Sequence, residues 1–276
     1  MPPRVDVVKT NPEAEGVTPQ LAGLGMTMDE MKALSRQILV AIPYRAREGV
    51  NAGICIHYGL WGPLGTKVFH VVDPHGGFIE IVRCGIVRSF LEACKTFPEL
   101  KYLVMIDNDQ AVEADCLLRL ARHDLPVVSG IVCSASEKKG IFACVTVKTA
   151  TGAAYFPTIN TTKVMPAEGV VEVHQAGTGL ICIRRDVLET LMSCGELPFY
   201  IPEHVRRNAA ETGDLHKSED ISFADVCEKY GIKRYADLSV RAIHYKLLAL
   251  SWPEDKIDPS LKAEDWDVQP HDAEGG

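Results

Sequence analysis

The sequence YLVMIDNDQAVEADCL, residues 102–117, places two carboxylates directly after a hydrophobic run. The run from Tyr102 to Ile106 predicts a buried strand, because a short apolar run bounded by polar residues is typical of one. Asp107 and Asp109 follow with one residue between them, so both side chains share a face if the chain stays extended. Two carboxylates this close repel each other, and we expect a cation between them. The alternative is a turn or a helix cap, in which both side chains accept hydrogen bonds from backbone amides.

Strand-like and helix-like segments alternate on both sides of this motif. The expected strands cover residues 37–45, 67–74, 102–106 and 125–133. The expected helices cover 27–36, 48–60, 78–96 and 112–123. The first of these helices begins with the spacing of a capping box, Thr27 to Glu30. The alternation predicts an α/β fold with a doubly wound, mostly parallel sheet and helices on both faces. Ligands of such folds bind beyond the carboxyl ends of the strands, where Asp107 and Asp109 lie.

The second half of the chain contains more strands and fewer helices. The expected strands are 140–148, 169–176, 179–185, 232–238 and 240–246, and the expected helices are 186–192 and 218–230. They predict a smaller mixed sheet beside the main one. We expect three regions, which are an N-terminal extension with a short helix (1–34), a main domain (35–250) and an acidic, proline-containing tail (251–276). Residues 1–26 and the tail after Trp252 are expected to be extended and solvated.

Composition narrows the class of protein further. The chain has 276 residues, 46% of them hydrophobic, so it can bury a sizeable core. No apolar run reaches the roughly 18 residues of a membrane span, and the start has no signal-peptide core. The nine cysteines are scattered without a C-x-x-C pair, which indicates reduced thiols in the cytoplasm rather than zinc or disulfides. The tail carries −6 of the net charge of −8, so the rest of the chain is nearly neutral.

A glycine-flanked threonine forms the second motif, in HQAGTGLICIRRDVLE, residues 174–189. Gly177 and Gly179 allow close approach of the backbone to a ligand. An ordinary hairpin turn between two strands is the alternative.

Two acids and a late histidine form the last candidates. Glu219 and Asp220 begin an expected helix, where acidic side chains complement the helix dipole. The alternative is a general base in a cleft. His244 lies in the short segment VRAIHYK, where it is either a hydrogen-bonded core residue or a metal ligand.

The order of these motifs resembles the A-type glycosyltransferase fold (GT-A), and in particular small soluble bacterial and phage enzymes similar to glycosyltransferase family 2. The resemblance covers residues 37–246 and rests on ILVAIPYR, IVRCGIVRSFLEA, MIDND, AGTGLICIRRDVLE, SEDISF and His244. One departure lies in the helix where the family often carries Arg-Asn, because Cys84 follows Arg83 here.

The resemblance implies a role for each matching residue. Asp109, Asp107 and His244 would bind Mn²⁺ or Mg²⁺. Asp220 would be the catalytic base, and Glu219 would help to position the acceptor. The residues expected to contact the nucleotide-sugar are Pro43, Tyr44, Arg45, Arg83, Asp107, Asn108, Gly177, Thr178 and Gly179.

The resemblance therefore implies a metal-dependent glycosyltransferase that uses a UDP- or GDP-sugar and a hydroxyl acceptor. The acceptor would be a glycan, a small molecule, a protein or a hydroxymethylated base in phage DNA. The DNA reading rests on two basic stretches, residues 136–140 and 204–210, and on Arg206 and Arg207 in particular. The alternatives are a nucleotidyltransferase that makes sugar nucleotides and a non-catalytic nucleotide-sugar-binding module of the same fold.

Overall fold

The computed structural model describes residues 5–7, 24–45, 58–73, 78–136, 140–148, 154–155, 165–202, 218–245, 249–250 and 257–263. Its helices are α2 (Met28–Ser35), α4 (Tyr58–Leu64), α5 (Ile79–Thr96), α6 (Cys116–Arg122), α7 (Arg185–Ser193) and α9 (Glu219–Lys229). None of these helices is long and apolar enough to cross a membrane.

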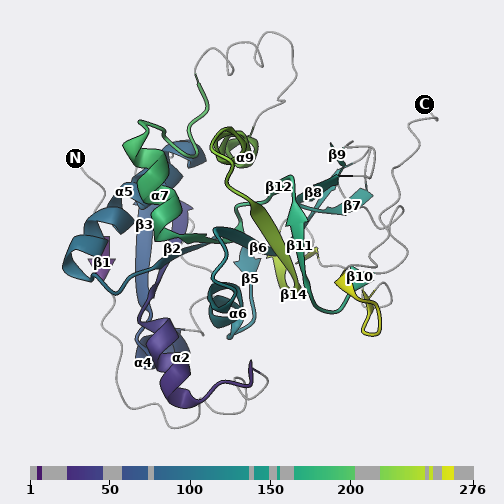
Figure 1. Cartoon of the computed structure of the whole chain (residues 1–276), viewed down its shortest axis with the longest axis horizontal. Coiled ribbons are helices and arrows are strands. Elements are labelled where there is room, and N and C mark those ends of the chain that lie inside the picture. The colour runs from purple at the N-terminus through teal and green to yellow at the C-terminus, as the bar shows by residue number, and fades with distance from the viewer. Residues whose placement is uncertain are drawn as a thin grey trace.

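The central sheet has the order β1-β3-β2-β4-β13-β6-β14-β11 (Figure 1). Its strands are β1 (Val5–Val7), β2 (Ile38–Arg45), β3 (Lys67–Asp73), β4 (Tyr102–Ile106), β6 (Val127–Ser136), β11 (Val170–Val173), β13 (Leu180–Arg184) and β14 (Arg234–Tyr245). Strands β2, β3, β4, β6 and β14 run in one direction, and β13 runs against its neighbours β4 and β6. The predicted α/β class with a mostly parallel sheet is confirmed.

Alternate residues of the central strands face two separate cores. Ile38, Val40 and Ile42 pack against α2, α4 and α6, whereas Leu39 and Ala41 pack against α5, α7 and α9. Strands buried on both faces need apolar residues at nearly every position, which is why β2 and β4 read as continuous hydrophobic runs. The result is a three-layer arrangement with helices on both faces of the sheet (Figure 1).

Short strands extend the sheet and build two smaller ones. They are β5 (Gln110–Ala111), β7 (Gly140–Ala143), β8 (Val145–Lys148), β9 (Ala154–Tyr155), β10 (Met165–Pro166), β12 (Gln175–Ala176), β15 (Ala249–Leu250) and β16 (Ile257–Asp258). The small sheet β12-β8-β9 is antiparallel rather than mixed, and β10 pairs with β16 in parallel. A third core lies where these strands meet β6, β11 and β14.

Several expected boundaries were wrong. The two late strands are one continuous strand, β14, whose pairing with β6 shifts register between Asp237 and Arg241. The segment 140–148 divides at Cys144, because β7 pairs with β6 while β8 pairs with β12. Helix α6 begins at Cys116 instead of residue 112.

The two ends of the chain also depart from the expected solvated extensions. Val5–Val7 pairs antiparallel with β3 at the edge of the sheet. Ile257 and Ala263 pack against the third core. Ala263 also lies close to Gly169, since a Cβ added to Gly169 would lie 2.4 Å from the Cβ of Ala263. The expected helix 48–60 lies mostly outside the described residues, of which Tyr58 is the first in α4. The proposed limits of the three regions stay a prediction.

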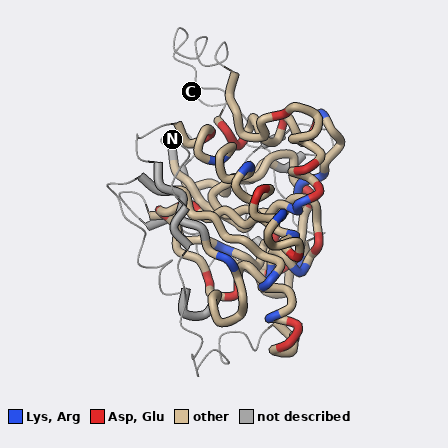
Figure 2. The backbone as a smooth tube through the Cα atoms, turned by 90° about the vertical axis from the view of Figure 1, so that its left-hand side faces the viewer, with Lys and Arg blue, Asp and Glu red and all other residues tan. Residues whose placement is uncertain are grey.

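Basic and acidic residues are interspersed on the side of the molecule that Figure 2 shows. This mixed distribution agrees with the nearly neutral charge of the sequence before the tail.

Candidate active site

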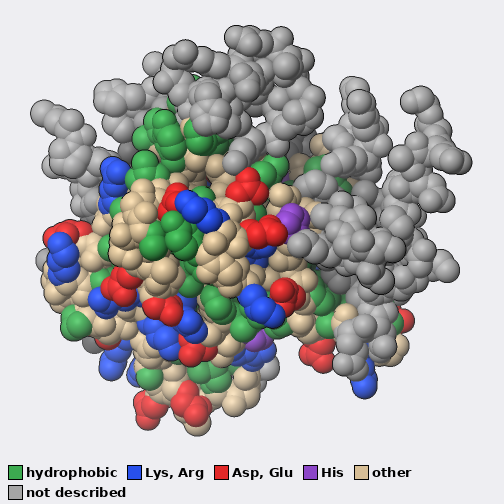
Figure 3. Space-filling view, turned by 45° about the horizontal axis from the view of Figure 1, so that its top comes forward, with side chains coloured by type: hydrophobic (Ala, Val, Ile, Leu, Met, Phe, Trp, Pro, Cys, Tyr) green, Lys and Arg blue, Asp and Glu red, His purple; other side chains and the backbone are tan. Residues whose placement is uncertain are grey.

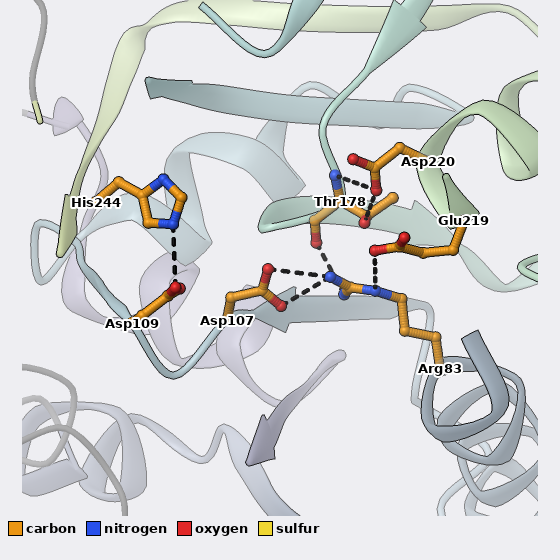
Figure 4. Close-up of polar contacts among 7 residues, drawn as sticks. All are labelled: Arg83, Asp107, Asp109, Thr178, Glu219, Asp220 and His244. Carbon is orange, nitrogen blue, oxygen red and sulfur yellow. Dashed lines mark hydrogen bonds and ion pairs between the residues drawn. The ribbon is translucent and has the colours of Figure 1, made fainter. Parts of the chain in front are cut away.

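Polar side chains from five segments meet beyond the carboxyl end of β4 (Figure 4). Asp107 and Asp109 follow β4 directly, and Thr178 lies in the loop between β12 and β13. Helix α5 supplies Arg83, the start of α9 supplies Glu219 and Asp220, and the end of β14 supplies His244. In Figure 3, acidic side chains lie beside a histidine near the middle of the face shown.

Arg83 is the buried cation at the centre of this group. Only 1% of its surface is exposed. Its Nη2 atom lies 2.8 and 3.0 Å from the two carboxylate oxygens of Asp107, and its Nε lies 3.5 Å from Glu219 Oε1. Its Nη1 donates a hydrogen bond of 3.1 Å to the Thr178 carbonyl oxygen. A buried guanidinium needs such partners, because leaving it unpaired costs several kcal/mol.

The group carries more negative than positive charge. Burial disfavours the charged form of Arg83, but Asp107, Asp220 and Glu219 raise its pKa above the ordinary value. Burial also raises the pKa of Asp107, although the nearby guanidinium acts in the opposite direction. Three acidic side chains, Asp107, Glu219 and Asp220, act on one arginine, and Asp109 lies nearby, so the negative charge of the site can accommodate a further cation.

Glu219 has a pKa well above its ordinary value. Burial and the neighbouring carboxylate of Asp220 raise the pKa of Glu219 to about 7, while Arg83 lowers it by less. Glu219 therefore titrates near neutral pH.

We expect the pH dependence of stability to change in Glu219→Gln. The pKa of Glu219 is about 7 in the folded protein against an ordinary 4.5, so the folded state favours the protonated acid. The stability from this preference is present below about pH 4.5 and is lost as the pH rises through about 7. Between pH 4.5 and 8, the free energy of unfolding of the wild type should fall relative to that of Glu219→Gln by up to about 3 kcal/mol.

Urea unfolding at pH 5, 6, 7 and 8 measures this difference. Glu92→Gln is the control, since Glu92 is an exposed acid whose side chain is 72% accessible on α5. Parallel curves for the wild type and Glu219→Gln would show that Glu219 ionises normally.

The glycine-flanked loop is not a hairpin. Strand β12 pairs with β8 in the small sheet, whereas β13 pairs with β4 and β6 in the central sheet. A Cβ on Gly177 would lie 2.9 Å from Cys144 Cβ, and one on Gly179 would lie 2.0 Å from Gln110 Nε2. Both positions therefore require the close packing that only glycine permits.

Asp109 and His244 form a separate pair beside the arginine cluster. His244 Nε2 lies 3.1 Å from Asp109 Oδ2, and His244 Nδ1 lies 2.8 Å from the Cys133 carbonyl oxygen. A carbonyl can only accept, so we assign a proton to Nδ1. Nε2 then faces a carboxylate oxygen, which is favourable only when a second proton or a metal cation lies between them.

The structure brings together two of the three predicted metal ligands, Asp109 and His244. It places the third, Asp107, against Arg83. Among the residues described, no three His, Cys, Asp or Glu side chains converge closely enough to hold a metal ion by themselves.

The remaining predicted contacts lie on β2, on the turn after β4, or outside the described residues. Pro43 is buried near the end of β2, and Asn108 is half-buried in the turn after β4. Tyr44 and Arg45 end β2 opposite Val72 and Asp73 of β3, and their side chains lie outside the described residues. The basic stretch 204–210 lies outside them entirely, as do residues 137–139.

Gln110 is a site neighbour for which the sequence showed no signal. It is 1% exposed, and its side-chain amide packs against Gly179. Its backbone pairs with His244, which holds the end of β14 beside the carboxylates. Only its position immediately after Asp109 could have indicated this role.

The strand order defines an α/β protein with a mostly parallel central sheet, and the acidic group lies beyond the carboxyl end of β4. No family model and no curated protein matches the sequence.

Similarity to known proteins is found among solved structures. A197 from STIV matches with a TM-score of 0.50 and 16% identity, over 86% of this chain and 95% of that one. The crystal structure of GalNAc-T7 with UDP, GalNAc and Mn²⁺ matches with a TM-score of 0.42 and 11% identity, over 86% of this chain and 54% of that one. A glycosyltransferase involved in the glycosylation of the major capsid of PBCV-1 matches with a TM-score of 0.31 and 10% identity, over 64% of this chain and 76% of that one. The likeness to A197 supports the fold.

Proposed function

We propose that the protein is a metal-dependent glycosyltransferase that moves a sugar from a nucleoside diphosphate, UDP or GDP, to a hydroxyl acceptor. One observation carries the proposal. The Asp109–His244 pair and the carboxylate of Asp220 flank one buried arginine cluster beyond the carboxyl end of β4. Such an arrangement separates a place for a metal-bound diphosphate from a place for a base.

The chemistry of the Asp109–His244 pair fits a divalent cation. Metal-binding histidines usually donate their other ring N–H to a carbonyl or a carboxylate, as His244 does to Cys133. Mg²⁺ and similar ions are often held by one or two carboxylates, with phosphate and water completing the coordination. Asp109 and His244 would hold the ion, which would neutralise the charge that develops on the leaving diphosphate.

The residues of the chain supply the other parts of the transfer. Asp220 accepts the proton of the acceptor hydroxyl, whose oxygen forms a bond to the anomeric carbon of the sugar. The bond between that carbon and the diphosphate oxygen breaks, and the nucleoside diphosphate leaves with the bonding electrons. A direct displacement of this kind inverts the anomeric carbon. Arg83 lies between Asp107 and Glu219 and holds both side chains in place.

A thermal-shift screen tests the proposed function. UDP-, GDP-, CDP- and TDP-sugars are added with Mn²⁺ or with EDTA. A ligand that binds only the folded protein raises its stability by about 2.7 kcal/mol at 100 times Kd. We expect UDP- or GDP-sugars to stabilise the protein only with Mn²⁺. Absence of any stabilisation would contradict the proposal, and stabilisation without transfer to any hydroxyl would favour a binding module.

Metal dependence should be lost in Asp109→Asn. This variant keeps the size of the side chain but removes the carboxylate that faces His244. We expect the affinity for UDP or GDP in the presence of Mn²⁺ to fall at least roughly tenfold, since even indirect partners of metal ligands are worth about 10–100-fold. Titration calorimetry measures this affinity with Mn²⁺ and with EDTA. Asp29→Asn, an exposed acid on α2, is the control. Equal, EDTA-insensitive binding by the wild type and Asp109→Asn would exclude this metal site.

A further inference from the structure

Thr178 is fully buried, and each of its polar groups has a partner in the site. None of its surface is exposed. Its hydroxyl donates to Asp220 Oδ1, and its backbone N–H donates to the same oxygen at 3.3 Å. Its carbonyl accepts from Arg83 Nη1 at 3.1 Å. A residue without exposed surface is poorly placed to touch a donor or an acceptor.

The backbone around Thr178 is held in one position. The Gly177 N–H donates to the Cys144 carbonyl at 2.6 Å, and the Asp107 N–H donates to the Gly179 carbonyl at 2.8 Å. Close packing at both glycines leaves no space for a side chain. The Thr178 hydroxyl and N–H are therefore fixed relative to β4 and the small sheet.

Both donors of Thr178 converge on one oxygen of Asp220. In Figure 4 both dashed lines from Thr178 end on this oxygen, and neither ends on the second one. A carboxylate has lone pairs on each oxygen, so one oxygen can be held by the protein while the other accepts a proton. Catalytic bases in other enzymes are likewise oriented by a hydrogen bond from a third group.

We propose that Thr178 is a positioning residue that orients the Asp220 carboxylate as the base, with Oδ1 held by the protein and Oδ2 presented to the acceptor hydroxyl. The proposal rests on the proposed function and deepens it. The Thr178 carbonyl also connects the base to Arg83, and through Arg83 to Asp107. The position of the base is thereby fixed relative to Asp107, which follows β4.

Thr178→Val, which keeps the shape of the side chain and removes the hydroxyl, tests the proposal. A positioned base contributes about 10²–10⁴-fold to the rate, so we expect kcat to fall roughly tenfold to a hundredfold. The KM for the donor and the Kd for UDP with Mn²⁺ should stay within about threefold, because the metal pair does not touch Thr178. Thr178→Ser keeps the hydroxyl and should retain kcat within about threefold.

The probe is release of nucleoside diphosphate from UDP-glucose, UDP-GlcNAc or GDP-mannose with Mn²⁺, with water as the acceptor. Thr190→Val is the matched control, since the Thr190 hydroxyl donates to the Asp186 carbonyl on the exposed side of α7. Thr178→Ala replaces Thr178→Val if circular dichroism shows that the latter does not fold. The double variant Thr178→Val with Asp220→Asn completes a cycle.

Non-additivity is the decisive result. If Thr178 acts through Asp220, then Thr178→Val causes no further loss of rate once Asp220 is Asn. An equal loss in both backgrounds, a parallel loss of UDP affinity, or failure of Thr178→Ser to restore the rate would overturn the proposal in favour of a structural role. If the wild type neither binds UDP or GDP with Mn²⁺ nor releases nucleotide, the proposed function itself fails, and that is seen before any variant is made.

Discussion

Arg83→Gln should lower the free energy of unfolding by about 3–5 kcal/mol, because it leaves the carboxylates of Asp107 and Glu219 half-buried without their cation. Urea unfolding at pH 7 measures the loss. Arg88→Gln, an exposed arginine on the same helix, should change stability by less than about 0.5 kcal/mol. Equal stabilities of the two variants would show that the cluster contributes nothing to folding.

A second variant separates the missing charge from the missing packing. Removing both members of a buried ion pair costs much less than removing one. Arg83→Gln combined with Asp107→Asn should therefore be more stable than Arg83→Gln alone. If the double variant is less stable than the single one, the contribution of Arg83 lies in its contacts rather than in its charge.

Asp220→Asn should abolish nearly all transfer and leave nucleotide binding intact. A hydroxyl is a poor nucleophile at neutral pH, and loss of a positioned base costs about 10²–10⁴-fold in rate. The asparagine keeps the size of the side chain and can still accept from Thr178, so the loop should hold its position. Calorimetry with UDP or GDP and Mn²⁺ should give a Kd within about threefold of the wild type.

The matched control is Asp225→Asn, an exposed acid five residues further along the same helix. Its rate should remain close to that of the wild type. Transfer by Asp220→Asn within about threefold of the wild type would remove Asp220 as the base. Retention of the anomeric configuration in the product would do the same, since a retaining reaction requires no base there.

Local patterns in the sequence were enough for the elements that depend on local physics. The Thr27–Glu30 capping box is present, with both side chains bonded to the opposite backbone N–H. The periodicity of residues 78–96 marked α5 within one residue, and the apolar run 102–106 is β4. Periodicity is reliable here because burial on one or two faces selects the residues directly.

Pairing between distant strands decided what the sequence could not show. Residues 232–246 contain a polar interruption that read as a break, yet β14 continues through it because β6 pairs with it on both sides of the register shift. A hairpin was one of the two interpretations of the segments before and after Gly177 and Gly179, yet these segments join different sheets. Strand partners are chosen by the whole fold, so no local pattern specifies them.

The sequence by itself determined that carboxylates follow β4, that two more begin α9, and that an arginine and a histidine accompany them. It could not determine which of these side chains form pairs with one another. Arg83 was expected at the nucleotide, and Asp107 beside Asp109 on one cation. The tertiary structure places Arg83 between Asp107 and Glu219, joins Asp109 to His244, and bonds Asp220 to Thr178. The nucleotide contact and the shared cation stay predictions. Burial explains the observed pairs, because a guanidinium without water takes the nearest carboxylates as partners, and only folding decides which carboxylates are near.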